Sequence, residues 1–212
     1  MKEMLINAKN AKQDIASLST DKKNELLLSM ADSLINNSDK ILKANEQDIK
    51  NATGKINDVM IDRLRLTSER IEAMANGIRD VSKLKDPVGR IFDTFTREDG
   101  LKIEKMSVPF GVVAIIYESR PNVTSDAAAL CIKSGNVCVL RGGKEAFNSA
   151  NAIVDALKSG IKGLGVNENI INLVTDTKRE SATALMTANG YVDFNIICIK
   201  NAKSIIFIWL II

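Results

Sequence analysis

The spacing of hydrophobic residues changes along this 212-residue chain, and each spacing predicts a different kind of element. In the first part, apolar residues recur every three or four positions, as they do in helices with one buried face. Residues that can cap a helix precede these stretches, and Asp86-Pro87 stops the last of them. Helices are predicted to begin at the cap residues Thr20 and Ser38, near Asp58, and after the cap residue Thr67.

Residues 89–106 instead alternate between apolar and polar side chains. The alternating segments 90–93 and 101–106 flank a turn at 97–100, so we expect a two-stranded ribbon with one face in water. A hairpin of this size is only marginally stable alone. We therefore expect the ribbon to pack against its own domain or against another subunit.

Residues 107–145 have the rhythm of a strand, a helix and a second strand. The first of these segments is almost continuously aliphatic, which is typical of a strand covered on both faces. The predicted order is a strand over 108–116, a turn containing Pro121, a helix over 127–133 capped by Thr124 or Ser125, an exit at Gly135-Asn136, and a strand over 137–140.

The alternation of strand and helix continues beyond this unit. A helix is predicted over residues 145–160, a strand over 169–174, a helix over 181–188, and a strand that opens at Tyr191. Repetition of this kind predicts an α/β domain with a mostly parallel sheet, preceded by the N-terminal helices and the hairpin.

Residues 194–212 differ in character from the rest of the chain. They are rich in Ile, Asn and Lys and show neither helical nor alternating order, and the apolar run 205–212 is too short to span a bilayer. An exposed apolar end would be sticky in a soluble domain. We therefore expect one domain over residues 1–193 and a separate apolar tail over residues 194–212.

Composition narrows the classes of function. The net charge of +3 comes from 29 basic and 26 acidic residues that are interspersed, so no nucleic-acid footprint is expected. No signal peptide or membrane segment is recognised, and three cysteines without a CxxC spacing favour a reducing, cytoplasmic compartment. The absence of histidine removes His-assisted nucleophiles and His-ligated zinc, and no metal site is expected.

The candidate site lies where the first two predicted parallel strands end, at residues 118–122 and 141–144. Arg141 and Lys144 flank two glycines, and cations beside free backbone N–H groups suit a phosphate or a phosphorylated ribose. Spacing alone does not distinguish this from a pair of solvated surface cations. A nucleotide P-loop is rejected, because Cys138 stands in place of its first glycine and Glu145 in place of its Ser/Thr.

Several side chains near this site also have ordinary structural explanations. Cys131 and Cys138 fit small buried hydrophobic positions better than nucleophiles. Glu118 and Arg120 could pair with each other, and Asn122 could form only an Asx turn.

The motifs YESRPNVT, SDAAALCIKSGN and VCVLRGGKEA closely resemble the gamma-glutamyl phosphate reductase (glutamate-5-semialdehyde dehydrogenase) family of the aldehyde dehydrogenase superfamily. The resemblance runs from near the N-terminus to about Asp193. It implies a partial Rossmann-like nucleotide-binding domain and an NADPH-dependent reduction of L-glutamate 5-phosphate to the 5-semialdehyde in proline biosynthesis. In that family a cysteine thiolate attacks the acyl phosphate, and hydride transfer to the thioester releases the aldehyde. It also implies a homo-oligomer that acts on a small molecule.

The resemblance assigns roles to residues at both strand ends. The cofactor-binding residues it implies, which form the loop beside the adenosine ribose phosphate and the loop leading to the catalytic centre, are Arg141, Gly142, Gly143, Lys144, Tyr117 and Glu118. Asn122 is implied as an oxyanion donor.

After Asp193 the sequence departs from the family pattern. The continuation expected there, including the domain with the nucleophilic cysteine, is replaced by the Ile-rich tail, and none of Cys131, Cys138 or Cys198 matches that nucleophile. We therefore expect a truncated, inactive form produced by a frameshift or truncation near Asp193. The alternative is a non-catalytic domain that binds a nucleotide or a partner.

Overall fold

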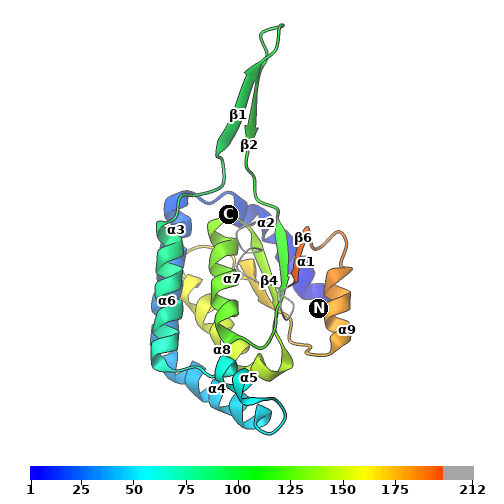
Figure 1. Cartoon of the computed structure of the whole chain (residues 1–212). Helices are drawn as coiled ribbons and strands as arrows, with labels where there is room; N and C mark the ends of the chain where they lie inside the picture. Colours follow the sequence, from blue (N-terminus) through cyan, green and yellow to red (C-terminus); the bar gives the residue numbers. More distant parts are fainter. Residues whose placement is uncertain (198–212) are drawn as a thin grey trace.

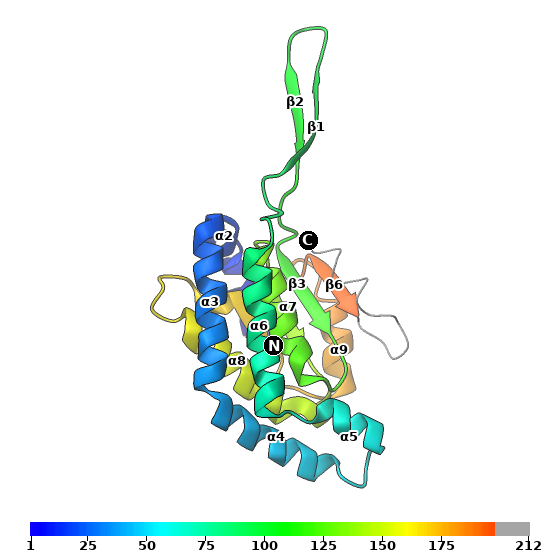
Figure 2. The same ribbon diagram turned by 60° about the vertical axis from the view of Figure 1, so that its left-hand side comes forward.

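A computed structural model describes residues 1–197, which form a body of helices around a parallel sheet, with a β-hairpin projecting from one end (Figures 1 and 2). The helical elements are α1 (Lys2–Asn10), α2 (Lys12–Ala16), α3 (Thr20–Asn36), α4 (Ser38–Ala52), α5 (Asp58–Leu64), α6 (Ser68–Lys83), α7 (Pro121–Lys133), η1 (Lys144–Ala146), α8 (Phe147–Ile161), η2 (Glu168–Ile170) and α9 (Arg179–Met186). The strands are β1 (Ile91–Thr96), β2 (Lys102–Met106), β3 (Val112–Ile116), β4 (Val137–Arg141), β5 (Ile171–Leu173) and β6 (Phe194–Ile197). The predicted α/β class is confirmed.

The N-terminal helices form where the hydrophobic spacing predicts them, with small shifts at their starts. Thr67 caps α6 as predicted, because its hydroxyl accepts a hydrogen bond of 3.2 Å from the N–H of Arg70. Ser19 rather than Thr20 caps α3, and Thr20 instead donates to Asp86 at 2.8 Å. Asn37 rather than Ser38 precedes α4, and it makes no side-chain cap there.

The main sheet has four parallel strands in the order β5-β4-β3-β6. Helices α7 and α8 cover it on one side, with α3 and α6 packed behind them, while α1 and α9 contact the strands from the other side (Figure 1). The first four residues of both β3 and β4 are buried, which explains their continuous apolar sequence. One hydrophobic core joins the strands to these helices.

Strand β3 begins four residues later than predicted. Pro109 has no N–H to donate to a ladder, and Gly111 adopts a φ of +118°, which an L side chain rarely allows. Val108 and Phe110 are consequently exposed although they are aliphatic or aromatic. The predicted strand over residues 108–116 is therefore wrong in its first part.

Helix α7 begins at Pro121, several residues before the predicted caps. Proline suits the first helical position, because its fixed φ matches the helix and its missing N–H would have no helical partner there. Thr124 and Ser125 lie inside the helix, where Ser125 donates to the carbonyl of Asn122 at 2.8 Å. The capping role predicted for these two residues is wrong.

The strand predicted to open at Tyr191 begins at Phe194 and pairs with β3. The ring of Phe194 stacks on Phe110 with centroids 4.7 Å apart. Residues 194–197, which the sequence analysis assigns to the tail, therefore form a regular strand of the sheet. Cys198 and the apolar run 205–212 lie outside the described residues. No helix within residues 1–197 is long and apolar enough to cross a membrane.

The hairpin of β1 and β2, here called the arm, has the predicted antiparallel pairing. An irregularity at Phe92, between the pairs of Ile91 and Asp93, adds one residue to β1. The arm stands away from the body in both views (Figures 1 and 2), and every residue of β1 is exposed. Of the two alternatives that the sequence leaves open, packing against its own domain is not seen within the described residues, and packing against another subunit stays a prediction.

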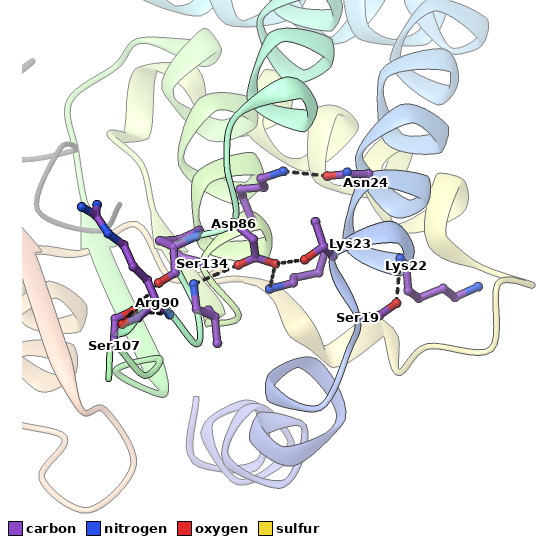
Figure 3. Close-up of polar contacts among 12 residues, drawn as sticks. Ser19, Lys22, Lys23, Asn24, Asp86, Arg90, Ser107 and Ser134 are labelled. Carbon is purple, nitrogen blue, oxygen red and sulfur yellow. Dashed lines mark hydrogen bonds and ion pairs between the residues drawn. The ribbon is translucent and has the colours of Figure 1, made fainter. Parts of the chain in front are cut away.

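Hydrogen bonds hold the arm firmly at its root (Figure 3). Asp86 accepts from the N–H of Val88 at 2.9 Å and pairs with Lys23 at 2.5 Å. Ser107 closes the two strands, because its hydroxyl accepts from the N–H of Arg90 at 3.1 Å and donates to the carbonyl of Pro87. Asp86 thus ties the arm root to α3, and Ser107 joins the two sides of the root to each other.

Candidate functional site

The predicted site lies at the end of the body opposite the arm, where β3, β4 and β5 finish above α4 and α5 (Figure 1). The chain runs from β3 through β4 to β5 in one direction across the sheet and then returns to place β6 on the other side of β3. In open parallel sheets, ligands favour the carboxyl ends of strands near such a reversal. The loop after β3 and the turn after β4 both lie at this edge.

Tyr117, a predicted cofactor-binding residue, is buried beneath the loop after β3. Its side chain is buried, and its hydroxyl shares a hydrogen bond of 2.7 Å with Thr124. Burial raises the pKa of Tyr117 above its usual value of 10.0, although the bond to Thr124 acts in the other direction. A Cβ on Gly142 would lie 3.2 Å from the tyrosine ring. Glycine at 142 therefore lets the turn after β4 approach the loop after β3.

Ser119 and Glu145 connect the two loops, and sequence reasoning missed both roles. The Ser119 hydroxyl donates to Glu145 Oε2 at 2.5 Å, and a Cβ on Gly143 would collide with Ser119. The glycine pair was the available signal that two backbones meet closely here. Within the described residues Glu118 and Arg120 form no ion pair; the N–H of Arg120 donates to the Glu118 carbonyl at 2.8 Å.

Arg141 and Lys144, which the sequence analysis places together, have different environments in the structure. Arg141 Nη2 donates to the carbonyls of Thr177 and Lys178 at 2.9 and 3.0 Å, so this guanidinium ties β4 to the loop before α9. Its Nε is buried and has no hydrogen-bond partner among the described residues. Lys144, by contrast, is exposed at the start of η1.

A cavity of about 440 Å³ opens beside Lys144. Its polar lining comes from the end of α4, the loop that follows it, the turn after β4 and the loop after β5, and includes Asn51, Lys55, Lys144, Glu145, Thr175 and Thr177. The ammonium groups of the exposed Lys55 and Lys144 on facing elements could each contact a phosphate group, although Asp48 and Glu145 balance them in formal charge. Lys55 carries no motif in the sequence, and only the folding of α4 beneath the sheet edge brings it here.

Asp48 shapes the floor of the same cavity. Its buried carboxylate accepts hydrogen bonds from the backbone N–H groups of Asn148 and Ser149 at 3.2 and 2.7 Å, and from both side chains at 2.7 and 2.6 Å. A carboxylate at the start of a helix satisfies N–H groups that lack helical partners. Asp48 therefore fixes the start of α8 against α4.

Asn122 faces a different cavity, of about 320 Å³, between α5, α6 and α7. The polar residues that line it are Arg63, Arg65, Arg70, Asn122 and Asp126. The Asn122 side-chain amide donates to Asp126 at 3.2 Å, which replaces the Asx turn considered from the sequence. Burial raises the pKa of Asp126 to about 6, even though hydrogen bonds from Asn122 and Ser125 lower it in part.

The two described cysteines are buried, as their sequence context predicts. Cys131 and Cys138 are both fully inaccessible and unpaired in a disulfide. Burial raises the pKa of the Cys138 thiol, and the neighbouring Cys131 raises it further. Within residues 1–197 no cluster of three or more cysteine or carboxylate side chains is arranged to hold a metal ion.

Comparison with known proteins gives consistent matches. The aldehyde dehydrogenase family model matches residues 1–195. A gamma-glutamyl phosphate reductase of Streptococcus suis strain 05ZYH33 is 59% identical over 182 residues, which are 86% of this chain and 44% of that protein. The solved structure of a gamma-glutamyl phosphate reductase from Thermotoga maritima has a TM-score of 0.91 at 34% identity, covering 98% of this chain and 50% of that one. Its counterpart from Saccharomyces cerevisiae gives 0.85 at 30% identity, covering 94% and 51%. The chain thus spans about half the length of these relatives, or slightly less.

Proposed function

The chain belongs to the aldehyde dehydrogenase family, and from this premise we propose that it carries the nucleotide-binding part of a gamma-glutamyl phosphate reductase. The complete reaction would reduce L-glutamate 5-phosphate to L-glutamate 5-semialdehyde in proline biosynthesis, in the cytoplasm. Relatives of that name at 59% identity support the assignment, as do the loop motifs at residues 117–124 and 141–145.

One observation carries the proposal: the turn after β4 and the cavity beside it lie at the carboxyl edge of a parallel sheet, next to its reversal. Lys144 and Lys55 would hold a phosphate of the cofactor there, and Gly142 and Gly143 would keep the turn close to the loop after β3. Arg141 would hold this turn in place through its bonds to the carbonyls of Thr177 and Lys178, and its buried Nε has no hydrogen-bond partner within residues 1–197. These residues fit a nicotinamide dinucleotide, which supplies hydride when bound.

We propose NADPH rather than NADH as that cofactor. The carboxylates of Asp48 and Glu145 balance the two lysines in formal charge, but they are engaged by the start of α8 and by Ser119, which leaves the exposed lysine ammonium groups available to a ligand. Cations of this kind favour the additional phosphate of NADPH. Glu118 and Tyr117 would act by shaping the loop after β3, with Asn122 as the oxyanion donor further along it.

We also propose that these 212 residues do not catalyse the reaction alone. The chemistry needs an accessible thiolate, whereas Cys131 and Cys138 are buried with no access to the sheet edge. Cys198 lies outside the described residues. The sequence change after Asp193 supports a frameshift as the origin of the tail, and sequencing the gene across that point tests it: an error-free frame with no homologous frame downstream would contradict this origin.

Titration of the 212-residue chain with NADPH and NADH tests the cofactor assignment. We expect saturable NADPH binding that is at least about tenfold tighter than NADH binding. Lys144→Ala should weaken NADPH binding about tenfold or more, because a charge-assisted contact is worth about 1.5–3 kcal/mol. Lys85→Ala, at the arm end of the body, is the matched control and should leave binding unchanged. Equal effects of the two substitutions would contradict the proposed site.

An assay with L-glutamate 5-phosphate and NADPH tests the proposed lack of catalysis. We expect no formation of semialdehyde by the pure chain. Turnover that disappears on alkylation of a cysteine would contradict the proposal. Saturable NADPH binding without turnover would also agree with a non-catalytic nucleotide-binding domain, an alternative that the buried cysteines favour. A second experiment distinguishes the two: a cysteine-bearing segment of a relative is added, and restored turnover would show that the chain is part of an enzyme.

We propose further that the arm mediates homo-oligomer formation. Phe92 and Phe95 are 65% and 45% exposed, and the outer edges of β1 and β2 have no strand beside them within the described residues. Exposed apolar strands of this kind are suited to pairing with another copy. Sedimentation analysis should show a dimer or larger assembly that Phe95→Ser shifts to monomer. A monomeric parent chain would contradict this proposal.

A further inference from the structure

The cavity around Asn122 has an excess of cations that the proposed nucleotide site does not use. Arg63 and Arg65 belong to the end of α5 and the connector that follows, and Arg70 to the first turns of α6. The facing wall is the start of α7, with Asn122 and Asp126. At about 320 Å³ the cavity is large enough for a small organic ligand.

The three arginines have different roles. Arg70 donates to the carbonyls of Asp62 and Arg65 at 2.5 and 2.7 Å and pairs with the Asp62 carboxylate at 3.1 Å. Arg70 therefore stabilises the connector between α5 and α6, and its charge is balanced by the Asp62 carboxylate. Arg63 and Arg65 are exposed, and neither side chain makes a hydrogen bond or ion pair with any residue in 1–197. Two unmatched guanidinium groups thus line one cavity.

The opposite wall adds to this positive character. The start of the 13-residue helix α7 carries the positive end of the helix dipole. Asp126 is the acidic side chain lining the cavity, and it is held close to α6, where it lies 4.0 Å from a Cβ placed on Gly77. Its carboxyl group accepts hydrogen bonds from the side-chain amide of Asn122 and the hydroxyl of Ser125. The balance of charge therefore favours an anionic ligand.

We propose that this cavity binds an oxyanion of the acyl substrate, a carboxylate or a phosphate, with Arg63 and Arg65 as its ligands and Arg70 as a positioning residue. Arginine suits this role, because its planar donors match the two oxygens of a carboxylate or phosphate. The inference rests on the proposed function, in which the substrate carries both kinds of anion. It adds that selection of an anionic acyl substrate is built into the described part of the chain.

Arginine side-chain NMR signals of the 212-residue chain provide a test that needs no catalysis. L-glutamate and inorganic phosphate are titrated separately, which distinguishes a carboxylate site from a phosphate site. We expect saturable shifts of the Arg63 and Arg65 Nε–Hε signals with at least one probe, at dissociation constants on the order of 1 mM. The absence of shifts with both probes would overturn the proposal.

Matched variants establish whether the arginines themselves bind the probe. The Arg63→Gln/Arg65→Gln double variant should weaken binding at least about tenfold, since two charge-assisted contacts are lost. Arg90→Gln, an exposed arginine at the arm, should leave binding unchanged, and Asp126→Asn should strengthen it. Equal losses in the double variant and in Arg90→Gln would mean unspecific charge attraction and would overturn the proposal. Both cavity arginines are exposed, so the variants are expected to remain folded, as far-UV circular dichroism will show.

The result is independent of the nucleotide titration. Anion binding without NADPH binding would uphold this cavity and reject the proposed cofactor site. NADPH binding with no response at Arg63 and Arg65 would do the reverse.

Discussion

The arm and the parallel sheet contain strands of nearly equal length that are stabilised in different ways. The six residues of β1 are all exposed, whereas four of the five residues of β3 are buried between helices. The arm is specified locally, by alternating residues and a turn. Strand β3 instead pairs with β4 and β6, and its residue Val113 lies beside Phe194, which is far away in the sequence. Within one chain, the arm therefore has defined pairing but little cover, which is the condition of a segment that meets a partner.

The partly buried carboxyl groups at the two ends of the body have pKa values shifted in opposite directions. At the arm root, burial alone would raise the pKa of Asp86, but hydrogen bonds from Lys23, Val88 and Thr20 outweigh it and lower the pKa below 3.8. At the arginine-lined cavity, burial dominates and raises the pKa of Asp126 to about 6. The carboxylate form of Asp86 stabilises the fold, while that of Asp126 costs stability at a place where a ligand is expected.

The sharpest test of the first contrast compares one apolar residue from each region. Leu140→Ala in β4 should lower the free energy of unfolding by about 3–5 kcal/mol, because it leaves a cavity in a fully buried position. Phe95→Ala in β1 removes more apolar surface, but from a side chain that is 45% exposed, and should cost under about 1 kcal/mol in the monomer.

Urea unfolding under dilute conditions, where the chain is monomeric, measures both changes. A loss of comparable size from Phe95→Ala would mean that the arm packs against its own body. It would also remove the argument for a partner.

The second prediction concerns the arm root. Asp86→Asn should lower the unfolding free energy by about 2–3 kcal/mol at pH 7, because it deprives the nearly buried Lys23 of its ion-pair partner. Since the folded pKa of Asp86 lies below its usual value of 3.8, the unfolded chain takes up the proton first as pH falls. The stabilisation is therefore fully present above pH 3.8 and is lost as pH falls through the lower, folded value.

The difference between the parent chain and Asp86→Asn should accordingly shrink below about pH 4. Asp32→Asn is the matched control, because its 2.8 Å ion pair with Arg79 involves a carboxylate that is 66% exposed. It should cost less than about 1 kcal/mol. A difference for Asp86→Asn that does not change with pH would contradict the role given to its ionised form.

The sequence predicts most elements of the fold because their signals are local. Thr67 followed by an apolar period of three to four marks α6, and the alternation around residues 97–100 marks the arm. The start of α7 was misassigned because several residues there could begin a helix, and Pro121, at the first helical position, prevailed over the hydroxyl residues that follow.

The site was only partly predictable, for a physical reason. Arg141 to Lys144 and Asn122 stand at strand and helix ends, which a parallel sheet brings to one edge. Whether they share one cavity depends on how α4, α5 and α6 fold beneath that edge. That packing separates Asn122 from Lys144 and supplies Lys55, Arg63 and Arg65, which carry no motif of their own.

The third prediction concerns the partly buried Asp126, whose pKa is shifted in the direction opposite to that of Asp86. Asp126→Asn should raise the unfolding free energy by about 1–2 kcal/mol at pH 7, because it removes a carboxylate whose ionisation is opposed by burial. The folded pKa of about 6 lies above the usual value of 3.8, so the folded chain holds the proton longer as pH rises. Parent stability should therefore fall between about pH 4 and 6 and remain lower above that range.

Denaturant unfolding at pH 4 and pH 7 separates this effect from simple repacking. At pH 4 the parent and the variant should differ little, since Asp126 is largely protonated in the folded chain. A variant that is less stable than the parent at pH 7 would show that the ionised group contributes a favourable contact instead.

The smallest effect is expected from the ion pair within the arm. Lys105 and Asp93 lie opposite each other in the ladder with a separation of 2.8 Å, but their side chains are 56% and 46% exposed. Water and salt screen such a pair, so a double-mutant cycle with Lys105→Ala and Asp93→Ala should give a coupling of about 0.2–0.5 kcal/mol in the monomer that weakens further in high salt. The pair between Lys23 and Asp86 has nearly the same geometry without that exposure. A coupling in the arm as large as the loss at its root would mean that the arm's charges are shielded from water in solution, which the free arm cannot provide and a second copy of the chain could.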